Sequence, residues 1–365
     1  MKPDPGLASW LQLSLTPGLG ASTLRNLLRQ FGLPEVLLAR KRAELSAHMA
    51  PAALEALDSA RVRELVERAL DWAAADGHHI ITLADDAYPR ALLETADPPA
   101  LLYVHGRLEL LRSPALAVVG SRNASAQGES NAWQFAKALS EAGLTIVSGL
   151  ALGIDAAAHR GGLAGPGSTV AVLGTGIDVV YPTRNAELAA EIAQRGALVS
   201  EFTLGTPAIA HNFPRRNRLI SGLARGCLVV EAALASGSLI TARSAADQGR
   251  EVYAIPGSIH SPLSKGCHAL IKSGAKLVES AQDVLSELSG FQPSGSAHTG
   301  ASTSVADAGL LGVMGHDPVD VDSLCTRAGL TAEQVAAELL RLELDGRVTA
   351  LPGGLYQRLE KAHRG

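Results

Sequence analysis

The chain has 365 residues, of which 47% are hydrophobic and 19% are charged, and its formal net charge is -4. This composition excludes a disordered protein. With 32 basic and 36 acidic residues, the overall charge does not by itself indicate nucleic-acid binding. The three cysteines are widely spaced and show no zinc-ligand spacing, which is typical of a reducing compartment. The sequence also has no apolar leader and no run of about eighteen apolar residues. These features predict a cytoplasmic protein that does not span a membrane.

Residues 1–75 are predicted to form a helical domain, because Leu and Ala recur at helical spacing. The sequence Pro-Gly-Leu-Gly at 17–20 separates two of these patterns. A Gly-x-Gly turn of this kind resembles a helix-hairpin-helix, whose amides can hold a phosphate. A plain turn of a helical hairpin fits the same residues and is the favoured interpretation.

Short apolar runs then alternate with helical patterns over residues 77–290. Such nearly continuous runs are typical of parallel strands that are buried on both faces, and the helical stretches between them supply the crossovers. The runs lie at 115–120, 144–149, 168–174, 227–232 and 251–257, and crossover helices are expected at 127–142 and 239–249. The predicted fold class is therefore α/β, with a doubly wound parallel sheet that binds ligands at the carboxyl ends of its strands.

The last part of the chain is predicted to be a separate domain behind a linker. Residues 291–309 are rich in Ser, Gly, Thr and Ala, which is typical of a flexible linker. Residues 310–361 follow the order helix, turn, helix and β-hairpin of a winged helix. Its expected recognition helix carries four acidic residues between 333 and 345 against Arg341. DNA would be repelled by this face, so protein contact or structural support is favoured over DNA reading.

Small-residue loops follow almost every predicted strand, and their amides are suited to phosphates. The Gly-Thr-Gly at 174–176 is only part of a dinucleotide fingerprint, because Val179 stands where the last glycine is needed. No Walker A sequence occurs. Asp155 and His159 stand four residues apart at a helix start, which suits capping and packing at least as well as catalysis. We therefore expect no cofactor, no metal and no catalytic residue.

The stretch HNFPRRNRLISGLARG at 211–226 is the strongest candidate for anion binding. It holds four arginines, and no acidic residue occurs between Glu201 and Glu231. Arginine matches phosphate geometry, although a solvated helix face with arginines paired to these two acids fits the composition equally well. Phe213 favours the first interpretation, because a ring beside cations is the usual platform for an unpaired base, worth about 1–3 kcal/mol per base. Duplex DNA offers no free base face, so single strands are favoured.

Seven motifs resemble, in one order, the DprA/Smf family of bacterial DNA-processing proteins. They are VGSRNAS, SGLALGIDAAAH, TVAVLGTGIDVVYPTRN, FPRRNRLISGL, VVEAALASGSLITA, REVYAIPGS and KGCHALIKSGA. The N-terminal helices look like the family's SAM-like domain, and the tail looks like its winged helix. The resemblance implies a non-enzymatic protein that binds single-stranded DNA, protects incoming DNA during natural transformation and loads RecA on strands coated by single-strand binding protein. It also implies that the α/β domain at 77–290 is an extended Rossmann-like domain and that the protein forms a homodimer through it.

The resemblance further implies DNA contacts from the loops and from the arginine stretch. The expected DNA-binding residues are Gly120, Ser121, Arg122, Ser148, Gly149, Phe213, Arg215, Arg216, Asn217, Arg218, Gly237 and Ser238. The chain departs from the family pattern at Ala210, where some relatives carry a Lys, and Arg215 could replace that contact. His268 stands where many relatives have Asn, and no contact is assigned to it.

Two other functions fit parts of the sequence. A Rossmann-like domain with anion-binding loops suits a nucleotide phosphoribohydrolase, but those enzymes carry the signature P-G-G-x-G-T-x-x-E. The Pro-Gly-Gly of this chain, at 352–354, lies in the predicted wing, and the loop SGSLITA lacks the catalytic acid. Alternatively, the winged helix alone reads duplex DNA and the core is a scaffold.

Overall fold

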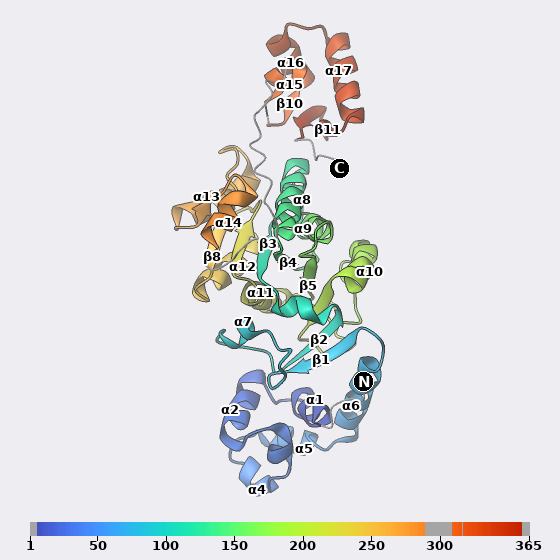
Figure 1. Cartoon of the computed structure of the whole chain (residues 1–365), viewed down its shortest axis with the longest axis vertical. Coiled ribbons are helices and arrows are strands. Elements are labelled where there is room, and N and C mark those ends of the chain that lie inside the picture. The colour runs from blue at the N-terminus through green and yellow to red at the C-terminus, as the bar shows by residue number, and fades with distance from the viewer. Residues whose placement is uncertain (1–5, 289–308, 316, 360–365) are drawn as a thin grey trace.

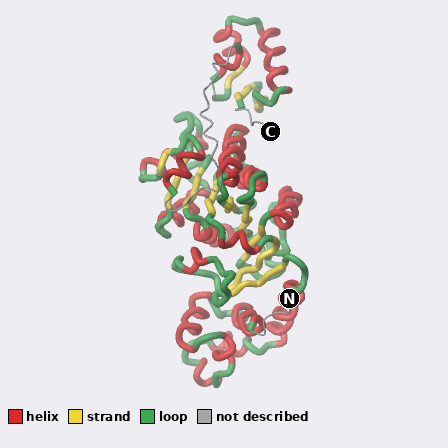
Figure 2. The backbone as a smooth tube through the Cα atoms, viewed as in Figure 1, coloured by secondary structure: helices red, strands yellow, loops and turns green. Residues whose placement is uncertain are grey.

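The computed structural model describes residues 6–288, 309–315 and 317–359. Its elements form a group of N-terminal helices, a central sheet with helices on both faces and a small C-terminal unit (Figures 1 and 2). The predicted linker at 291–309 lies almost entirely outside the described residues. Within the described ranges, no helix combines the length and the hydrophobicity that crossing a bilayer requires.

Short helices make up the N-terminal part. They are α1 (Leu7–Leu15), α2 (Ala21–Phe31), α3 (Pro34–Leu38), α4 (Arg42–Leu45), α5 (Pro51–Ala56) and α6 (Ala60–Ala73). Proline at the first position starts α3 and α5, where its missing N–H costs no helical hydrogen bond. The predicted turn at 17–20 joins α1 to α2, and its Gly18 has a φ of 81°, which favours glycine.

A nine-stranded sheet forms the centre of the described chain, in the order β1-β2-β6-β5-β4-β3-β7-β8-β9. The strands are β1 (His78–Thr82), β2 (Leu101–Gly106), β3 (Ala115–Val119), β4 (Thr145–Ser148), β5 (Thr169–Val172), β6 (Ala197–Ser200), β7 (Gly226–Val229), β8 (Glu251–Ala254) and β9 (Lys276–Leu277). The pairs β1–β2 and β2–β6 are antiparallel, and the other neighbours pair in parallel. The predicted α/β class with a mainly parallel sheet is confirmed, and β1, β2, β6 and β9 are additions to the five predicted strands.

Helices cover both faces of this sheet, as the side-chain alternation of β3 illustrates. Leu116 and Val118 pack with α8 (Ala126–Glu141) and α9 (Ile154–Leu163) on one face. The intervening residues Ala115, Ala117 and Val119 join the cluster of α11 (Asn212–Leu223) and α12 (Ser238–Asp247) on the other face. Because both faces are apolar, the strand reads as a continuous hydrophobic run in the sequence.

Four further helices complete the described central unit. They are α7 (Arg90–Leu93), α10 (Ala186–Arg195), α13 (Lys265–Lys272) and α14 (Ala281–Glu287), with 3-10 turns at Leu108–Arg112, Thr183–Asn185 and Pro262–Ser264. Buried residues of α10, Leu188 and Ile192, join the apolar core of the N-terminal helices. One continuous core therefore ties the N-terminal helices to the edge of the sheet that carries β1, β2 and β6.

The C-terminal unit has the order of a winged helix. Its elements are α15 (Leu310–Met314), β10 (Val319–Asp320), α16 (Val321–Ala328), α17 (Ala332–Leu344), β11 (Val348–Leu351) and β12 (Leu355–Arg358), with the strand order β10-β12-β11. A capping box of Thr331 and Gln334 starts α17, the expected recognition helix. Two acidic residues of α17 interact within the C-terminal unit. Glu338 forms an ion pair with Arg341 at 2.5 Å, and Glu343 accepts a hydrogen bond from the Ala350 N–H at 3.3 Å.

Candidate nucleic-acid interface

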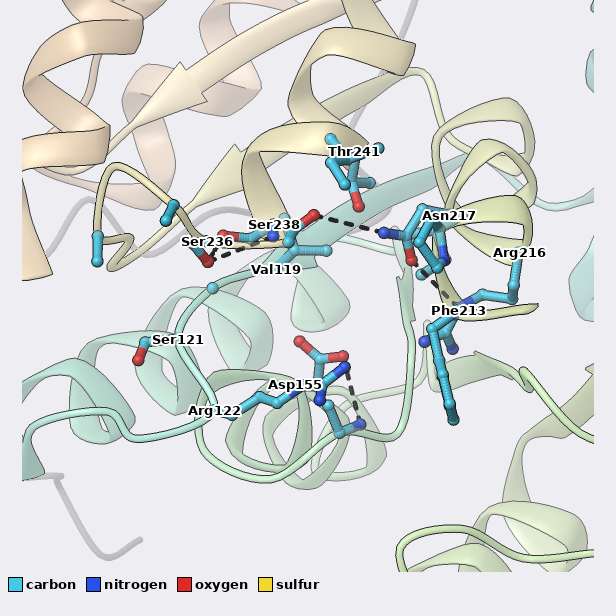
Figure 3. A pocket seen from close by; sticks show the side chains of 18 of the residues that line it. Val119, Ser121, Arg122, Asp155, Phe213, Arg216, Asn217, Ser236, Ser238 and Thr241 are labelled. Atoms are coloured by element: carbon cyan, nitrogen blue, oxygen red, sulfur yellow. Dashed lines mark hydrogen bonds between the residues drawn. The ribbon is translucent and has the colours of Figure 1, made fainter. Parts of the chain in front are cut away.

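A cleft of about 740 Å³ opens at the carboxyl edge of the sheet, between β3 and β7. The strands β4, β5 and β6 follow β3 on one side, whereas β7 and β8 continue on the other side. At such a switch point the loops diverge and leave a crevice, which is where doubly wound sheets bind ligands. The loops after β3 and β7 form two walls of the cleft, and α11 forms another (Figure 3).

Eight of the twelve predicted DNA-binding residues line this cleft. They are Gly120, Ser121, Arg122, Phe213, Arg216, Asn217, Gly237 and Ser238. The other four, Ser148, Gly149, Arg215 and Arg218, are absent from the cleft lining. The fold thus brings together segments that are more than a hundred residues apart in the sequence, and it sorts the predicted residues into two groups.

Aromatic rings and an exposed arginine form the open part of the cleft. The ring centroid of Phe213 lies 5.5 Å from that of Tyr181, and the Arg122 guanidinium carbon lies 5.8 Å from the Phe213 centroid. Arg122 is exposed and forms no ion pair with a described residue. Tyr181 was not predicted as a site residue; the scarcity of aromatic residues was the one sequence signal for it, and its place beside Phe213 depends on the fold. Rings beside a free cation suit an unpaired base and its phosphate.

Gly174 explains how the Phe213 ring is held at the cleft. A β carbon at this position would lie 2.6 Å from the Phe213 Cδ1 atom. The glycine therefore provides the space for the ring, and any larger residue would displace it. In the Gly-Thr-Gly stretch at 174–176, which resembles part of a dinucleotide fingerprint, the first glycine thus leaves room for an aromatic side chain.

Arg216 forms the floor of the cleft and is only 4% exposed. Its Nη1 donates to the carbonyl oxygens of Gly149, at 2.7 Å, and Val172. Gly149 makes this possible, because a β carbon there would lie 2.6 Å from the Arg216 Nη1 atom. Burial lowers the pKa of Arg216 to about 10, against the opposing charge of Asp155. The guanidinium stays charged at neutral pH, with most of its donors directed into the protein.

Asn217 connects the floor of the cleft to the loop after β7. Its Oδ1 accepts from the Arg216 Nε at 3.2 Å, and its Nδ2 donates to the Gly237 carbonyl at 3.4 Å. Ser238 begins α12, and its Oγ lies 2.7 Å from that of Ser236. A β carbon at Gly237 would meet no atom within 4 Å, so this loop is open on the cleft side. The positive end of the α12 dipole therefore faces the cleft.

Ser148 and Gly149 lie beneath the cleft rather than on it. The Ser148 Oγ donates to the Val118 carbonyl at 2.6 Å. The N–H groups of Gly149 and Ala151 donate to the Asp155 Oδ2 at 3.1 and 3.3 Å. Burial raises the pKa of Asp155, whereas Arg216 and these amide donors oppose the shift. The amides that the sequence suggested for phosphate binding are thus used to hold Asp155.

His159 also has a structural position, deep in the protein. Its Nε2 accepts from the Leu150 N–H at 3.2 Å, and its Nδ1 lies 2.7 Å from the Thr169 Oγ1. Because that hydroxyl donates to the Ile146 carbonyl, it must accept from the imidazole, so Nδ1 carries the proton. Burial lowers the pKa of His159 to about 3. Both ring nitrogens are occupied, and neither is available to a substrate.

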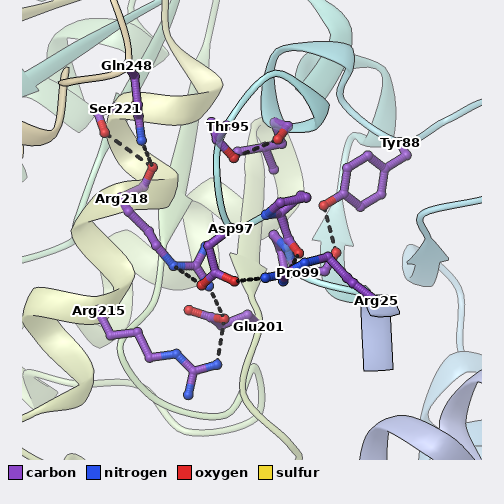
Figure 4. A network of polar contacts seen from close by, with 12 residues as sticks. Arg25, Tyr88, Thr95, Asp97, Pro99, Glu201, Arg215, Arg218, Ser221 and Gln248 are labelled. Atoms are coloured by element: carbon purple, nitrogen blue, oxygen red, sulfur yellow. Dashed lines mark hydrogen bonds and ion pairs between the residues drawn. The ribbon is translucent and has the colours of Figure 1, made fainter. Parts of the chain in front are cut away.

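Arg215 and Arg218 lie on the opposite side of α11. With 3.6 residues per turn, a helix that directs Phe213 and Arg216 to the cleft directs positions 215 and 218 away from it. Both arginines meet the same carboxylate oxygen, Glu201 Oε2, at 3.0 Å for Arg215 and 2.6 Å for Arg218 (Figure 4). For these two arginines the alternative interpretation, a helix face paired with acidic residues, therefore fits the structure. Their ion pairs with Glu201 do not support the predicted role as DNA contacts.

Two family models match this chain. Residues 79–289 match the family described as DNA recombination-mediator protein A, and residues 294–354 match the DprA winged helix domain. Over 309 residues the chain is 46% identical to protein Smf of Escherichia coli (strain K12), covering 82% of each chain.

Two solved structures are similar to this chain as well. The X-ray structure of DNA processing protein A from Streptococcus pneumoniae has a TM-score of 0.68 and 40% identity, and the match covers 80% of this chain and 100% of that one. The DNA processing protein A of Helicobacter pylori, whose structure concerns its single-stranded DNA binding mode, has a TM-score of 0.52 and 30% identity over 57% of this chain and 94% of that one.

Proposed function

Because this chain belongs to the DprA/Smf family of DNA-processing proteins, we propose that it binds single-stranded DNA in the cleft between β3 and β7. One observation carries the proposal: exposed Arg122 lies over the Phe213 ring, beside Tyr181, at the switch point of the sheet. The relative from Helicobacter pylori, which shares this fold at 30% identity, binds single-stranded DNA.

The geometry suggests how a strand is held. An unpaired base stacks on Phe213 and Tyr181, and a neighbouring phosphate meets Arg122 and the N-terminus of α12. Phosphate contacts position a strand without reading it, and stacking tolerates any base. Binding is therefore largely independent of sequence and falls with rising salt, because counterions are released when a phosphate is neutralised.

A binding protein is favoured over a nucleotide phosphoribohydrolase. Among the described side chains that line the cleft, Asp155 alone carries a carboxylate. Its Oδ2 already accepts from two loop amides. Acid–base catalysis of base release is favoured by a second carboxylate beside the first, and no other described carboxylate lines the cleft.

The finer role follows the family resemblance: protection of incoming DNA during natural transformation, loading of RecA on strands coated by single-strand binding protein, and action as a homodimer. Exposed apolar side chains support a self-association surface on the central unit. Leu234 and Ile259 are exposed, and they follow the neighbouring strands β7 and β8 at the same edge of the sheet. Exposed apolar groups that gather at one edge are typical of interaction surfaces.

The test is a fluorescence anisotropy titration of a labelled oligothymidylate with the full chain. Phe213→Ala removes one stacking platform and is expected to weaken binding roughly 5- to 150-fold, the equivalent of about 1–3 kcal/mol. Arg122→Ala removes one phosphate contact and is expected to lower the slope of log affinity against log salt by about 0.7. Arg112→Ala is the matched control, because this exposed arginine lies before the amino end of β3.

Unchanged affinity in both folded cleft variants would overturn the placement of the strand. Release of free base from nucleoside monophosphates by the wild-type chain would instead support the phosphoribohydrolase.

A further inference from the structure

A second cavity, of about 300 Å³, lies on the other side of α11, between the N-terminal helices and the sheet. The turn before α2, the start of β2, the segment after β6 and Arg215 all contribute to its lining. It shares no lining residue with the cleft between β3 and β7. None of the functions proposed above uses it.

Three buried oxygen atoms at this cavity have no hydrogen-bond partner in the described part of the chain. They are the Tyr103 hydroxyl, the Glu201 Oε1 and the Ser14 Oγ. Tyr103 is 1% exposed and the Glu201 side chain is 2% exposed. Leaving a buried polar group unpaired is costly, and so several such groups at one cavity indicate a missing polar partner.

The ion pairs of Glu201 occupy one of its two carboxylate oxygens, Oε2, and leave Oε1 for such a partner. Arg215 and Arg218 both approach the Oε2 atom from α11, and Asp97 joins Arg218 to Arg25 of α2 (Figure 4). Burial raises the pKa of Glu201, and the two arginines oppose the shift. Burial also raises the pKa of Tyr103, so that its phenol keeps its proton and can donate.

The other end of the cavity is suited to an anion. Gly20 is the N-cap of α2 and offers no side-chain acceptor to the first-turn amides, and no acidic residue stands in that turn. These amides and the positive end of the helix dipole meet the cavity at Gly20 and Ala21. Arg215, which is half exposed, lines the same cavity.

We infer that this cavity binds a mononucleotide, with its phosphate at the N-terminus of α2 and at Arg215 and its base between Leu19 and Phe202, where Glu201 and Tyr103 meet the polar edge of the base. A phosphate alone would leave the apolar walls and the inner oxygens without contact. A cytosine amino group donates to a carboxylate, and its carbonyl accepts from a hydroxyl. The volume falls at the lower end of the range of small-ligand sites.

The same chemistry is offered by a free nucleotide and by one nucleotide unit of a DNA strand. The inference does not depend on the strand proposed for the other cleft. Arg122→Ala is therefore expected to leave nucleotide binding at this cavity unchanged, which keeps the two proposals separable.

Calorimetric titration of the full chain with deoxycytidine monophosphate tests the site, with deoxycytidine and inorganic phosphate as partial ligands. Gly20→Asp places a carboxylate at the phosphate position and is expected to weaken binding at least roughly tenfold. A β carbon at Gly20 meets no atom within 4 Å and Asp is a favoured N-cap, so the variant is expected to unfold no more easily than the wild type. Gly20→Ala adds the β carbon without the charge and is the control.

Tyr103→Phe removes one inner hydroxyl and is expected to weaken nucleotide binding roughly three- to tenfold. Tyr253→Phe is its matched control, because the Tyr253 hydroxyl is also buried without a partner among the described residues but lies on β8, away from the cavity. Equal weakening by both tyrosine variants would contradict the assignment.

Binding of no probe by the wild-type chain, or unchanged affinity in Gly20→Asp, would overturn the site. Equal affinities for inorganic phosphate and for the nucleotide would overturn the nucleotide assignment. If Gly20→Asp also weakens oligodeoxycytidylate binding, the occupant is a unit of the strand, and if it weakens only the mononucleotide, the occupant is a free nucleotide.

Discussion

Arg122 and Arg216 line the same cleft, yet only Arg122 presents its charge to solvent. Burying a guanidinium is costly unless carbonyl and carboxylate groups surround it, and Arg216 finds them at Gly149, Val172 and Asp155. Its contacts connect α11 to the loop after β4 and to β5 beneath the cleft. Arg122 has no such partners among the described residues, which leaves its donors for a ligand.

His159 gives a residue-scale prediction about pH. Its pKa is about 3 in the fold, below the ordinary value of 6.5, so the unfolded chain binds one more proton between these values. Its contribution to stability is therefore fully present above about pH 6.5 and is lost as the pH falls toward 3, at up to about 1.4 kcal/mol per pH unit.

The free energy of unfolding in urea, measured at several values between about pH 4.5 and 7, checks this for the wild type and for His159→Gln. The glutamine keeps one donor and one acceptor but does not titrate. The wild type is expected to lose stability more steeply on acidification than the variant. Parallel curves for the two chains would show that His159 is not the titrating group.

Helix α11 has two faces with different partners, and this division is the main finding at the scale of elements. Phe213, Arg216 and Asn217 face the cleft, whereas Arg215 and Arg218 meet the buried carboxylate of Glu201. The helix thus lies between the proposed strand site and the N-terminal part of the chain. Any movement of α11 would change both sides at once, because one rigid helix carries both sets of side chains.

Substitution by alanine is expected to lower mainly the stability at Arg218 and mainly the strand affinity at its neighbour Asn217. Arg218→Ala removes one partner of a buried ion pair, which typically costs about 3–5 kcal/mol, and the remaining contact from Arg215 places the loss at the lower end. Its affinity for oligothymidylate is expected to stay unchanged, because the side chain faces away from the cleft.

Asn217→Ala is expected to lower strand affinity while costing only about 0.5–1.5 kcal/mol of stability. Urea unfolding and anisotropy titration of both variants make the comparison. A loss of affinity in Arg218→Ala without any loss of stability would show that Arg218 is a DNA contact after all.

At the scale of the whole molecule, the proposed strand site is built entirely by the central unit. Every residue that lines the cleft lies between Val119 and Thr241. The winged helix uses Glu338 and Glu343 of α17 in contacts within its own unit, and the acids of that helix disfavour a phosphate backbone. The N-terminal helices contribute to the second cavity instead.

A chain that ends at residue 288 is therefore expected to bind oligothymidylate within about twofold of the full chain, because all phosphate and stacking contacts remain. Anisotropy titration at two salt concentrations measures this. The truncated Arg122→Ala variant serves as the control and is expected to lose affinity as the full-length variant does. Loss of binding on truncation alone would move the site, or part of it, to the winged helix.

Much of the architecture could be predicted because it depends on local pattern. The apolar runs that became β3, β4, β5, β7 and β8 are buried on both faces and read as strands without any tertiary information. The strands β1 and β9 lack that continuous signal and are defined by tertiary pairing, whereas β2 and β6 carry short apolar runs that the sequence analysis did not assign as strands. Tyr181 was missed for a similar reason, since its place beside Phe213 depends on how two distant segments meet.

By itself, the sequence determined the α/β class, the carboxyl-edge loops and the family, because periodicity, glycine positions and motif order are properties of neighbouring residues. Only the tertiary structure decided that Arg215 and Arg218 of α11 are paired, that Arg216 is buried, and that Arg122 has no ion pair among the described residues. The deciding groups, Glu201 after β6 and the carbonyls after β4 and on β5, come from elsewhere in the chain. Charge pairing and burial depend on distances in space, and no spacing along one segment specifies them.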